Sequence, residues 1–183
     1  KVALRRTRRN YSAGIKRALD IALSAGALVL LSPGLLLIAA ILFVIDGGPV
    51  IYRHNRVGRN GRMFGCLKFR SMYRDAGRRL EAILESDPAR RQEWAGSQKL
   101  SDDPRVHRFG HLLRRSSLDE LPQFFNVLRG EMSIVGPRPI VTDELARYGE
   151  HADSYLAVMP GITGLWQVSG RNQIEFEDWV KLD

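Results

Sequence analysis

Cysteine is almost absent from this 183-residue chain, and several other common sequence signatures are missing with it. The single Cys66 excludes an internal disulfide and any zinc site built from several cysteines. No internal repeat, low-complexity tract or glycine-rich nucleotide fingerprint is present, which argues against a Rossmann-like fold. Because a lone thiol forms no internal disulfide, we expect the globular part to face a reducing compartment.

Acidic residues are also in short supply. The chain has 20 aspartates and glutamates against 28 lysines and arginines, for a net charge of +8. Such a balance predicts an anionic partner, which could be nucleic acid, acidic lipid or a phosphorylated substrate, and the charge alone does not choose among them. The length suits one globular domain with a membrane anchor.

Charged residues are missing altogether between Ile21 and Ile45, a run long enough to span a bilayer and too long for a signal peptide. Ser32-Pro33 falls at its midpoint, and arginines flank both ends, which the positive-inside rule places on the cytoplasmic side. We therefore expect a re-entrant helix, broken at Ser32-Pro33, whose halves of about 18 Å reach partway into a core of about 30 Å. The Ser32 hydroxyl is expected to satisfy a carbonyl freed by Pro33. A proline-kinked spanning helix is the alternative.

This segment divides the chain into three parts: a basic juxtamembrane segment (1–20), the membrane helix (21–46) and a catalytic domain (47–183). Two runs that favour β-strands, Val50–Val57 and Met63–Met72, are joined through Asn60-Gly61 and predict a hairpin. Amphipathic helices broken near Asp87-Pro88 and shorter helices around 142–148 and 153–158 follow. The expected fold is α/β (α+β), a small antiparallel sheet with surrounding amphipathic helices.

The candidate catalytic centre is the adjacent pair Asp119-Glu120, which lies among arginines. Neighbouring cations are expected to depress the carboxyl pKa, and Mg²⁺ is the expected link between these carboxylates and a phosphate. A capping box from Ser117 to Glu120 is the plain alternative, although Pro122 would then break the helix. A helix that begins later, at Asp119 or beyond, accommodates Pro122 and ends at Gly130.

Five ordered motifs carry a resemblance to a known family: Ser32-Pro33, Leu67-Lys68-Phe69-Arg70-Ser71-Met72, Ser117-Leu118-Asp119-Glu120-Leu121-Pro122-Gln123, Val135-Gly136-Pro137-Arg138-Pro139, and the stretch from Pro160 to Arg171. Together they resemble the bacterial sugar transferases, monotopic phosphoglycosyl transferases that act on polyprenyl phosphate. The resemblance covers the chain from about Lys16 to its end. It implies a re-entrant helix bearing a cytoplasmic domain at the bacterial inner membrane.

The resemblance implies transfer of a sugar 1-phosphate from a UDP-sugar to polyprenyl phosphate with Mg²⁺. Asp119 would attack the β-phosphorus, release UMP and carry the phosphosugar, while Glu120 with Asp119 would hold the metal. Glu131 is a further candidate ligand. The residues expected to bind phosphate or nucleotide are Arg114, Arg138, Lys68, Arg70 and Arg171. For Lys68 and Arg70, on an alternating strand, a solvated face is the equal alternative.

The sequence from Leu165 to Gly170 is similar to that of exopolysaccharide-initiating family members, which use UDP-glucose or UDP-galactose. Family members continue beyond this region, so a piece of a longer protein is expected. Two other functions remain open: a non-catalytic platform for polysaccharide assembly, and a membrane-tethered protein that binds anionic lipid or nucleic acid. On the transferase hypothesis the partners are membrane lipid and the two substrates, with no nucleic acid, and homo-oligomerisation is left open.

Overall fold

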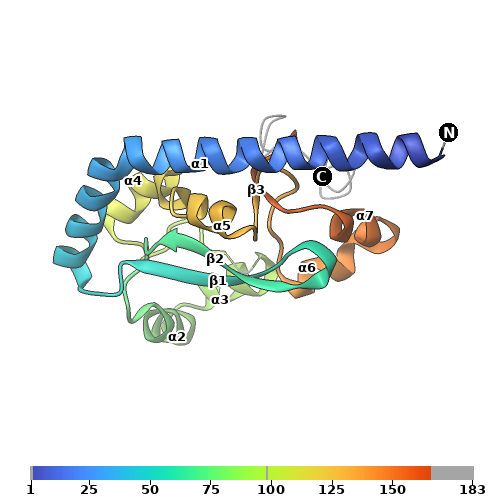
Figure 1. Ribbon diagram of the computed structural model, residues 1–183. Helices are drawn as coiled ribbons and strands as arrows, with labels where there is room; N and C mark the ends of the chain where they lie inside the picture. Colours follow the sequence, from blue (N-terminus) through green and yellow to red (C-terminus); the bar gives the residue numbers. More distant parts are fainter. Residues whose placement is uncertain (1, 98, 166–183) are drawn as a thin grey trace.

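A computed structural model describes residues 2–97 and 99–165 of the chain. It combines helices with two small sheets, and the long helix α1 (Val2–Asp46) lies along one side of the molecule (Figure 1). The mixed fold class predicted from the sequence is confirmed. The elements after α1 are β1 (Ile51–Val57), η1 (Arg59–Gly61), β2 (Met63–Phe69), α2 (Ala76–Ser86), α3 (Pro88–Ser97), α4 (Arg108–Ser116), η2 (Leu118–Glu120), α5 (Gln123–Arg129), β3 (Ser133–Val135), α6 (Thr142–Leu145), η3 (Ala146–His151), α7 (Ala152–Ala157) and β4 (Gly161–Thr163).

Helix α1 is continuous but bent. Figure 1 shows that it runs straight from its N-terminal end and then turns toward the rest of the domain. Pro33 lies inside it and removes the N–H that would have bonded the Val29 carbonyl, and the Ser32 hydroxyl donates to that same carbonyl at 2.8 Å. The prediction that the Ser32 hydroxyl satisfies the carbonyl freed by Pro33 is thus confirmed. The helix that was expected to break at Ser32-Pro33 is continuous through these residues.

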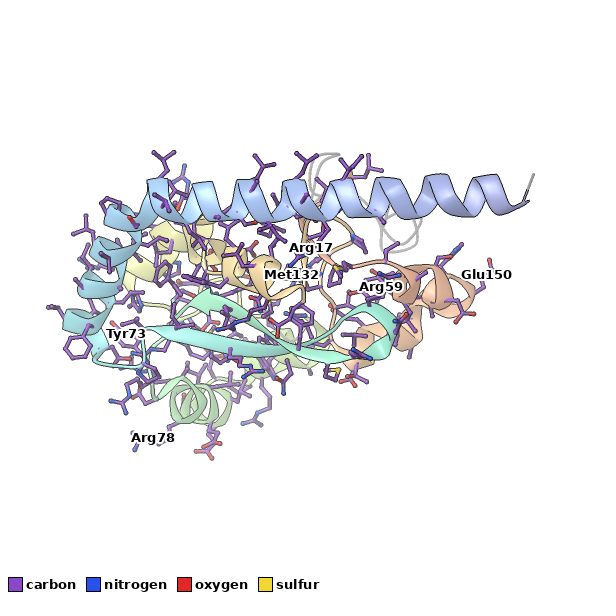
Figure 2. All side chains as sticks on the ribbon, in the orientation of Figure 1. Arg17, Arg59, Tyr73, Arg78, Met132 and Glu150 are labelled. Carbon is purple, nitrogen blue, oxygen red and sulfur yellow. The ribbon has the colours of Figure 1, made fainter. Side chains whose placement is uncertain are left out.

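The outer face of α1 is apolar and exposed. The segment Ala13–Asp46 is long and apolar enough to cross a membrane, and only 11% of its most apolar window is buried in the domain. Figure 2 shows side chains on this face pointing away from the rest of the molecule. Large exposed residues here include Val29, Leu30, Leu36, Leu37 and Val44. An exposed apolar band of this length suits lipid, and the re-entrant path stays a prediction.

Three charged residues on the inner face of α1 bind the rest of the domain. We term them the α1 clamp: Lys16, Arg17 and Asp20. Arg17 donates to the last carbonyls of α5, Val127 O at 2.7 Å and Leu128 O at 3.1 Å. Such a cation also suits the negative end of the α5 dipole. In Figure 2 Arg17 lies on the domain side of α1.

Asp20, which is buried, contacts β3. One carboxylate oxygen accepts from the Ile134 N–H at 3.1 Å, and the other accepts from the Ser133 hydroxyl at 2.8 Å. Lys16 pairs with the same carboxylate at 3.3 Å and also contacts the Ser133 hydroxyl. A buried charge is tolerated when it is paired and hydrogen-bonded in this way, so this end of α1 is part of the domain's structure.

Strands β1 and β2 form the antiparallel hairpin predicted from Asn60-Gly61. Asn60 adopts the left-handed conformation in the turn, and the register runs from Ile51 opposite Phe69 to Val57 opposite Met63. The structure adds a second, parallel pair of strands, β3 and β4. The predicted interruption near Asp87-Pro88 is confirmed, because α2 ends at Ser86 and α3 begins at Pro88.

Asn126 ties helix α5 to strand β2. Its fully buried side chain accepts from the Leu67 N–H at 2.9 Å and donates to the Gly65 carbonyl at 2.8 Å. The amide therefore satisfies two backbone groups of β2, as a neighbouring strand would. A second donated bond, at 2.6 Å, reaches the Glu131 carboxylate. The strand that carries Cys66 and Lys68 is thus held against the helix that follows Asp119.

Candidate functional site

The predicted catalytic pair lies on a tight turn between α4 and α5. The side chain of His107 accepts from the Gly110 N–H at 2.8 Å and caps the start of α4. At the other end, Ser117 is left-handed (φ 57°, ψ 16°) and turns the chain into η2, which contains Asp119 and Glu120. Left-handed geometry is unfavourable for a residue with a Cβ, and such positions concentrate at functional sites.

The two carboxylates do not serve as helix caps. Neither η2 nor α5 starts with a side-chain capping hydrogen bond, so the capping-box alternative is not seen. Helix α5 begins at Gln123, directly after Pro122, and ends at Gly130 with a positive φ of 78°. The predicted stop at Gly130 is confirmed. Pro122 was expected within the first turn and is instead the residue just before the helix, where its missing N–H is again not needed.

Asp119 is buried, with 8% of its surface exposed. Burial raises the pKa of this carboxyl above its ordinary value of 3.8, the nearby Glu120 charge also raises it, and Lys68 and Arg114 oppose the shift. The expectation of a depressed pKa was wrong for Asp119, because desolvation outweighs the neighbouring cations. A carboxylate so placed is poorly hydrated, which favours it as a nucleophile once ionised.

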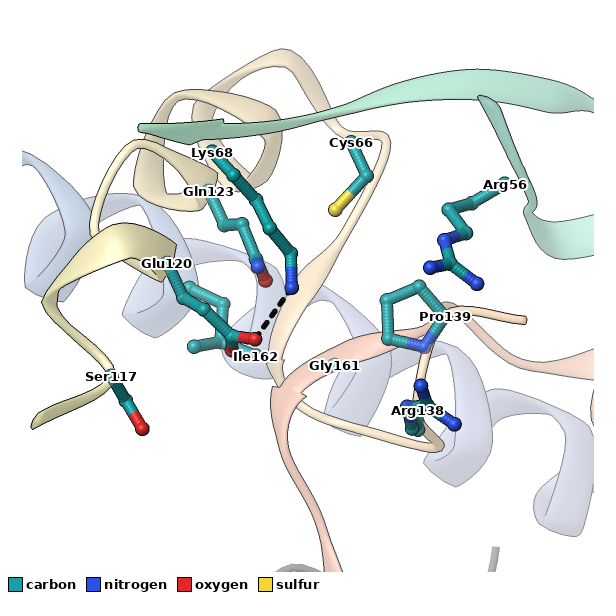
Figure 3. Close-up of a pocket in the computed structure, with 10 residues that line it drawn as sticks. All are labelled: Arg56, Cys66, Lys68, Ser117, Glu120, Gln123, Arg138, Pro139, Gly161 and Ile162. Carbon is teal, nitrogen blue, oxygen red and sulfur yellow. Dashed lines mark hydrogen bonds and ion pairs between the residues drawn. The ribbon is translucent and has the colours of Figure 1, made fainter. Parts of the chain in front are cut away.

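Glu120 projects toward a polar cavity beside the turn. Its Oε1 accepts from Lys68 Nζ at 2.7 Å, a charge-assisted hydrogen bond that crosses from η2 to β2 (Figure 3). The cavity has a volume of about 160 Å³. Its lining combines three cations with one carboxylate and comprises Arg56, Cys66, Lys68, Ser117, Glu120, Gln123, Arg138, Pro139, Gly161 and Ile162. Two of the predicted phosphate-binding residues, Lys68 and Arg138, therefore meet here.

Arg114 lies beside the pair from the last turn of α4. Its Nε donates to the Ser71 hydroxyl at 2.8 Å, and its charge acts on Asp119. Burial lowers the pKa of Arg114, and the negative charge of Asp119 offsets part of that effect. Arg114 therefore lies near Asp119, and its predicted role in phosphate binding stays a prediction.

The remaining predicted residues lie elsewhere. Arg70 follows the end of β2 and binds the end of α1 through the carbonyls of Asp46 and Gly47, at 3.3 and 2.7 Å, and through the Asp46 carboxylate at 3.5 Å. It is absent from the lining of the cavity. Glu131 is bound to the Asn126 amide and does not line the cavity either. Arg171 lies outside the described residues.

Arg56 is a cavity residue that sequence reasoning missed. In the hairpin register Arg56 lies opposite Phe64, and Cys66 lies opposite His54, so Arg56, Cys66 and Lys68 share one face. That register follows from the Asn60-Gly61 turn. Extending the alternation of side chains from β2 across the turn into β1 would have predicted that Arg56 lies on the same face of the hairpin as Lys68.

The oxygen donors available to a metal ion are the carboxylates of Asp119 and Glu120. Within residues 2–97 and 99–165, no three histidine, cysteine, aspartate or glutamate side chains lie together as a metal-binding group. Mg²⁺ is commonly held by one or two carboxylates together with substrate phosphates, so the adjacent pair fits that cation without a third protein ligand.

Known proteins similar to this chain include enzymes of lipid-linked sugar chemistry. The undecaprenyl-phosphate galactose phosphotransferase of Salmonella typhimurium is 50% identical, over 92% of this chain and 35% of its own length. The UDP-glucose:undecaprenyl-phosphate glucose-1-phosphate transferase of Escherichia coli is 42% identical, over 85% of this chain and 31% of its own length. The exopolysaccharide production protein ExoY of Sinorhizobium fredii is 49% identical, over 92% of this chain and 74% of its own length.

The chain spans about a third of the two larger relatives and about three quarters of ExoY. A family model described as bacterial sugar transferase matches residues 11–183 and so includes most of α1, the turn that carries Asp119 and the described lining of the cavity. The chain therefore belongs to the bacterial sugar transferase family.

Proposed function

We propose that this protein transfers a hexose 1-phosphate from a UDP-sugar to polyprenyl phosphate at a membrane surface, and so begins the assembly of an exopolysaccharide or another glycoconjugate. The observation that supports it best is the buried Asp119 next to Glu120, which pairs with Lys68 and lines a cationic cavity, in a domain bound to an apolar helix. UDP-glucose and UDP-galactose are the favoured donors, because similar proteins are named for glucose or galactose transfer.

The proposed reaction consists of two in-line displacements at Asp119. An oxygen of the ionised carboxylate attacks the β-phosphorus of the UDP-sugar, and the bond from that phosphorus to the bridging oxygen breaks. UMP leaves with the electron pair, and the phosphosugar remains on Asp119 as an acyl phosphate. An oxygen of the lipid phosphate then attacks the same phosphorus and restores the carboxylate, so two substrates use one site in turn.

The charged side chains around Asp119 have separable roles. Lys68 and Arg114 favour its ionised form against the effect of burial. Arginine and lysine side chains also stabilise the charge that develops on transferring phosphoryl oxygens, and Arg138 faces the cavity where those oxygens would lie. Mg²⁺ held by Glu120 and Asp119 would supply further neutralisation of the diphosphate.

Placement at a membrane follows from the same geometry. The outer face of α1 presents an apolar band to lipid, and basic residues flank its apolar run, which favours the cytoplasmic side of the bacterial inner membrane. A domain held against this helix would meet a lipid-linked acceptor at the bilayer surface and a soluble nucleotide sugar from the cytoplasm.

The test is isotope exchange in purified, detergent-solubilised protein. With Mg²⁺ and a panel of UDP-sugars but no lipid acceptor, labelled UMP should enter only the pool of the correct donor, because the covalent step is reversible. Adding polyprenyl phosphate should give net UMP release. Asp119→Asn should abolish both, while Asp153→Asn, an exposed aspartate of α7, should match wild type. Net release without any exchange would refute the covalent intermediate, and neither activity with any donor would favour a non-catalytic platform.

A further inference from the structure

A second and larger cavity lies beside α1, apart from the one that Glu120 lines. Its volume is about 590 Å³, which is within the range of about 300–1,000 Å³ that is usual for ligand sites. Its walls come from α1, from the hairpin turn, from β3 and the residues after it, from the end of α7, and from the residues after β4. Among the described residues, the two cavities share no lining residue.

Part of the wall of this second cavity is apolar and open to solvent. Val135 at the end of β3, Val158 directly after α7 and Leu165 after β4 all line it, and all three side chains are exposed. Because these residues come from three separate segments, their meeting is a product of the fold. Exposed apolar side chains that gather around a hollow are typical of a binding site.

The same cavity carries an excess of positive charge. Three cations line it, Lys16, Arg17 and Arg59, and Asp20 is the one carboxylate of its described lining. Asp20 is already paired with Lys16 and bonded to β3, and Arg17 bonds neutral carbonyl oxygens of α5. Arg59 is exposed on the hairpin turn, which lies on the domain side of α1 (Figure 2). An anionic group beside an apolar wall therefore suits this cavity.

The cavity lies where α1 changes from a basic to an apolar helix. Lys16 and Arg17 come just before the uncharged run that begins at Ile21. With the exposed apolar face of α1 in lipid, these two cations would lie at the level of the headgroups, because the hydrocarbon core is costly for charge. Basic pockets beside membrane helices bind the headgroups of anionic lipids. The position of the cavity therefore favours a lipid as its occupant.

The paired strands β3 and β4 separate this cavity from the one beside Asp119. Gly136 lines the second cavity and Gly161 lines the first, and their backbones are so close that a Cβ on either glycine would collide with the other segment. The Gly161 N–H also bonds the Pro137 carbonyl at 2.7 Å. A lipid chain cannot pass between segments packed in this way. A headgroup in the second cavity is thus shut off from Asp119 on this side, which favours a lipid that does not react.

We propose that the second cavity binds an anionic phospholipid of the surrounding membrane. The lipid phosphate lies between Arg17 and Arg59, and its acyl chains follow the wall that Val135, Val158 and Leu165 form. The bound lipid joins α1 to the hairpin turn and is a structural partner, not a substrate. This site is independent of the proposed function, because it depends only on the apolar helix and on the lining of the cavity.

The test is native mass spectrometry of the full chain in detergent, titrated with phosphatidylglycerol or with zwitterionic phosphatidylcholine. One phosphatidylglycerol should bind at least about 10-fold more tightly than phosphatidylcholine, because its net charge is negative. Arg59→Gln should weaken the binding of phosphatidylglycerol about 3- to 10-fold, through the loss of one cation. Arg62→Gln is the matched control, because Arg62 is an exposed arginine close by in the chain that is absent from the described lining.

Val158→Asp tests the apolar wall. Its carboxylate should remove the preference for phosphatidylglycerol, because it repels the anionic headgroup. Val158 and Arg59 are both exposed, so neither variant should shift the urea unfolding midpoint, and a loss of binding then reports on the site.

Equal affinity of the wild type for the two phospholipids would overturn the site, as would equal affinity of Arg59→Gln and Arg62→Gln for phosphatidylglycerol. Polyprenyl phosphate that displaces phosphatidylglycerol and depends on Arg59 to the same degree would assign the cavity to the acceptor and so overturn the proposal. Each of these results leaves the proposed function standing, because UMP exchange at Asp119 is measured without added lipid.

Discussion

Replacing Asn126 by leucine should destabilise the domain strongly, although Asn126 lies outside the cavity. The substitution removes the partners of the Gly65 carbonyl and the Leu67 N–H, which the asparagine bonds at 2.8 and 2.9 Å. Leaving a buried backbone group unsatisfied costs about 1–3 kcal/mol. Gly65 is buried and Leu67 is partly buried, so we expect a loss of about 2–5 kcal/mol, a large share of the 5–15 kcal/mol or so that holds a typical domain folded.

The assay is urea unfolding of the solubilised protein, followed by tryptophan fluorescence. With a slope of about 2 kcal/mol per molar urea, the midpoint should fall by roughly 1–2.5 M. Asn126→Asp should be at least as harmful, because it replaces the donor to the Gly65 carbonyl with an acceptor. Asn55→Leu, at an exposed position of β1, is the control. An Asn126→Leu midpoint equal to that of Asn55→Leu would show that the amide does not support β2, and would refute this reasoning.

Two further predictions concern charged residues. Burial raises the pKa of Asp119 above its ordinary value of 3.8, so the folded state holds the Asp119 proton more tightly than the unfolded chain does. The free energy of unfolding should therefore fall as the pH rises from 3.8 through the raised pKa. Asp119→Asn should therefore unfold at higher urea than wild type at neutral pH while losing all UMP exchange, and a less stable asparagine variant would contradict the assigned direction. In wild type, exchange should decline on acidification at a higher pH than for an ordinary aspartate, because protonated Asp119 cannot attack. A pH profile of the exchange rate checks this, and a decline that begins only at or below the ordinary value of 3.8 would contradict it. Arg70→Gln should lower the unfolding midpoint and leave the affinity for UMP unchanged, since Arg70 binds the end of α1; weaker UMP binding with normal stability would return Arg70 to the nucleotide site.

Much of the local structure could be predicted from short patterns. Asn60-Gly61 placed the hairpin, Gly130 placed the end of α5, and Pro88 separated α2 from α3. Each of these residues has backbone requirements that are decided within a few neighbours. The turn that carries Asp119 was located for a similar reason, since Pro122 restricts where the following helix can begin.

Properties set by distant parts of the chain were the ones missed. The pKa of Asp119 depends on how much of the domain covers it, which adjacent arginines do not report. Arg70 was grouped with Lys68 by alternation, but the strand ends at Phe69 and the end of α1 binds the arginine instead. The three-residue strands β3 and β4 are too short to show a period, and their pairing joins segments far apart in the chain.

The α1 clamp has a mechanical consequence. Asp20 binds β3, and the segment that follows β3 places Arg138 in the lining of the cavity. A short stretch of chain therefore connects the helix to the cavity. A flexible tether would let a domain take many heights and tilts above a lipid surface. The bonds between the α1 clamp and the domain instead fix one orientation of the domain relative to α1. With the apolar face of α1 in a bilayer, encounter with the proposed lipid-linked acceptor would become a search in two dimensions at a constant height above the membrane. A generic anchor grafted in place of α1 would keep the protein on the membrane but lose that alignment.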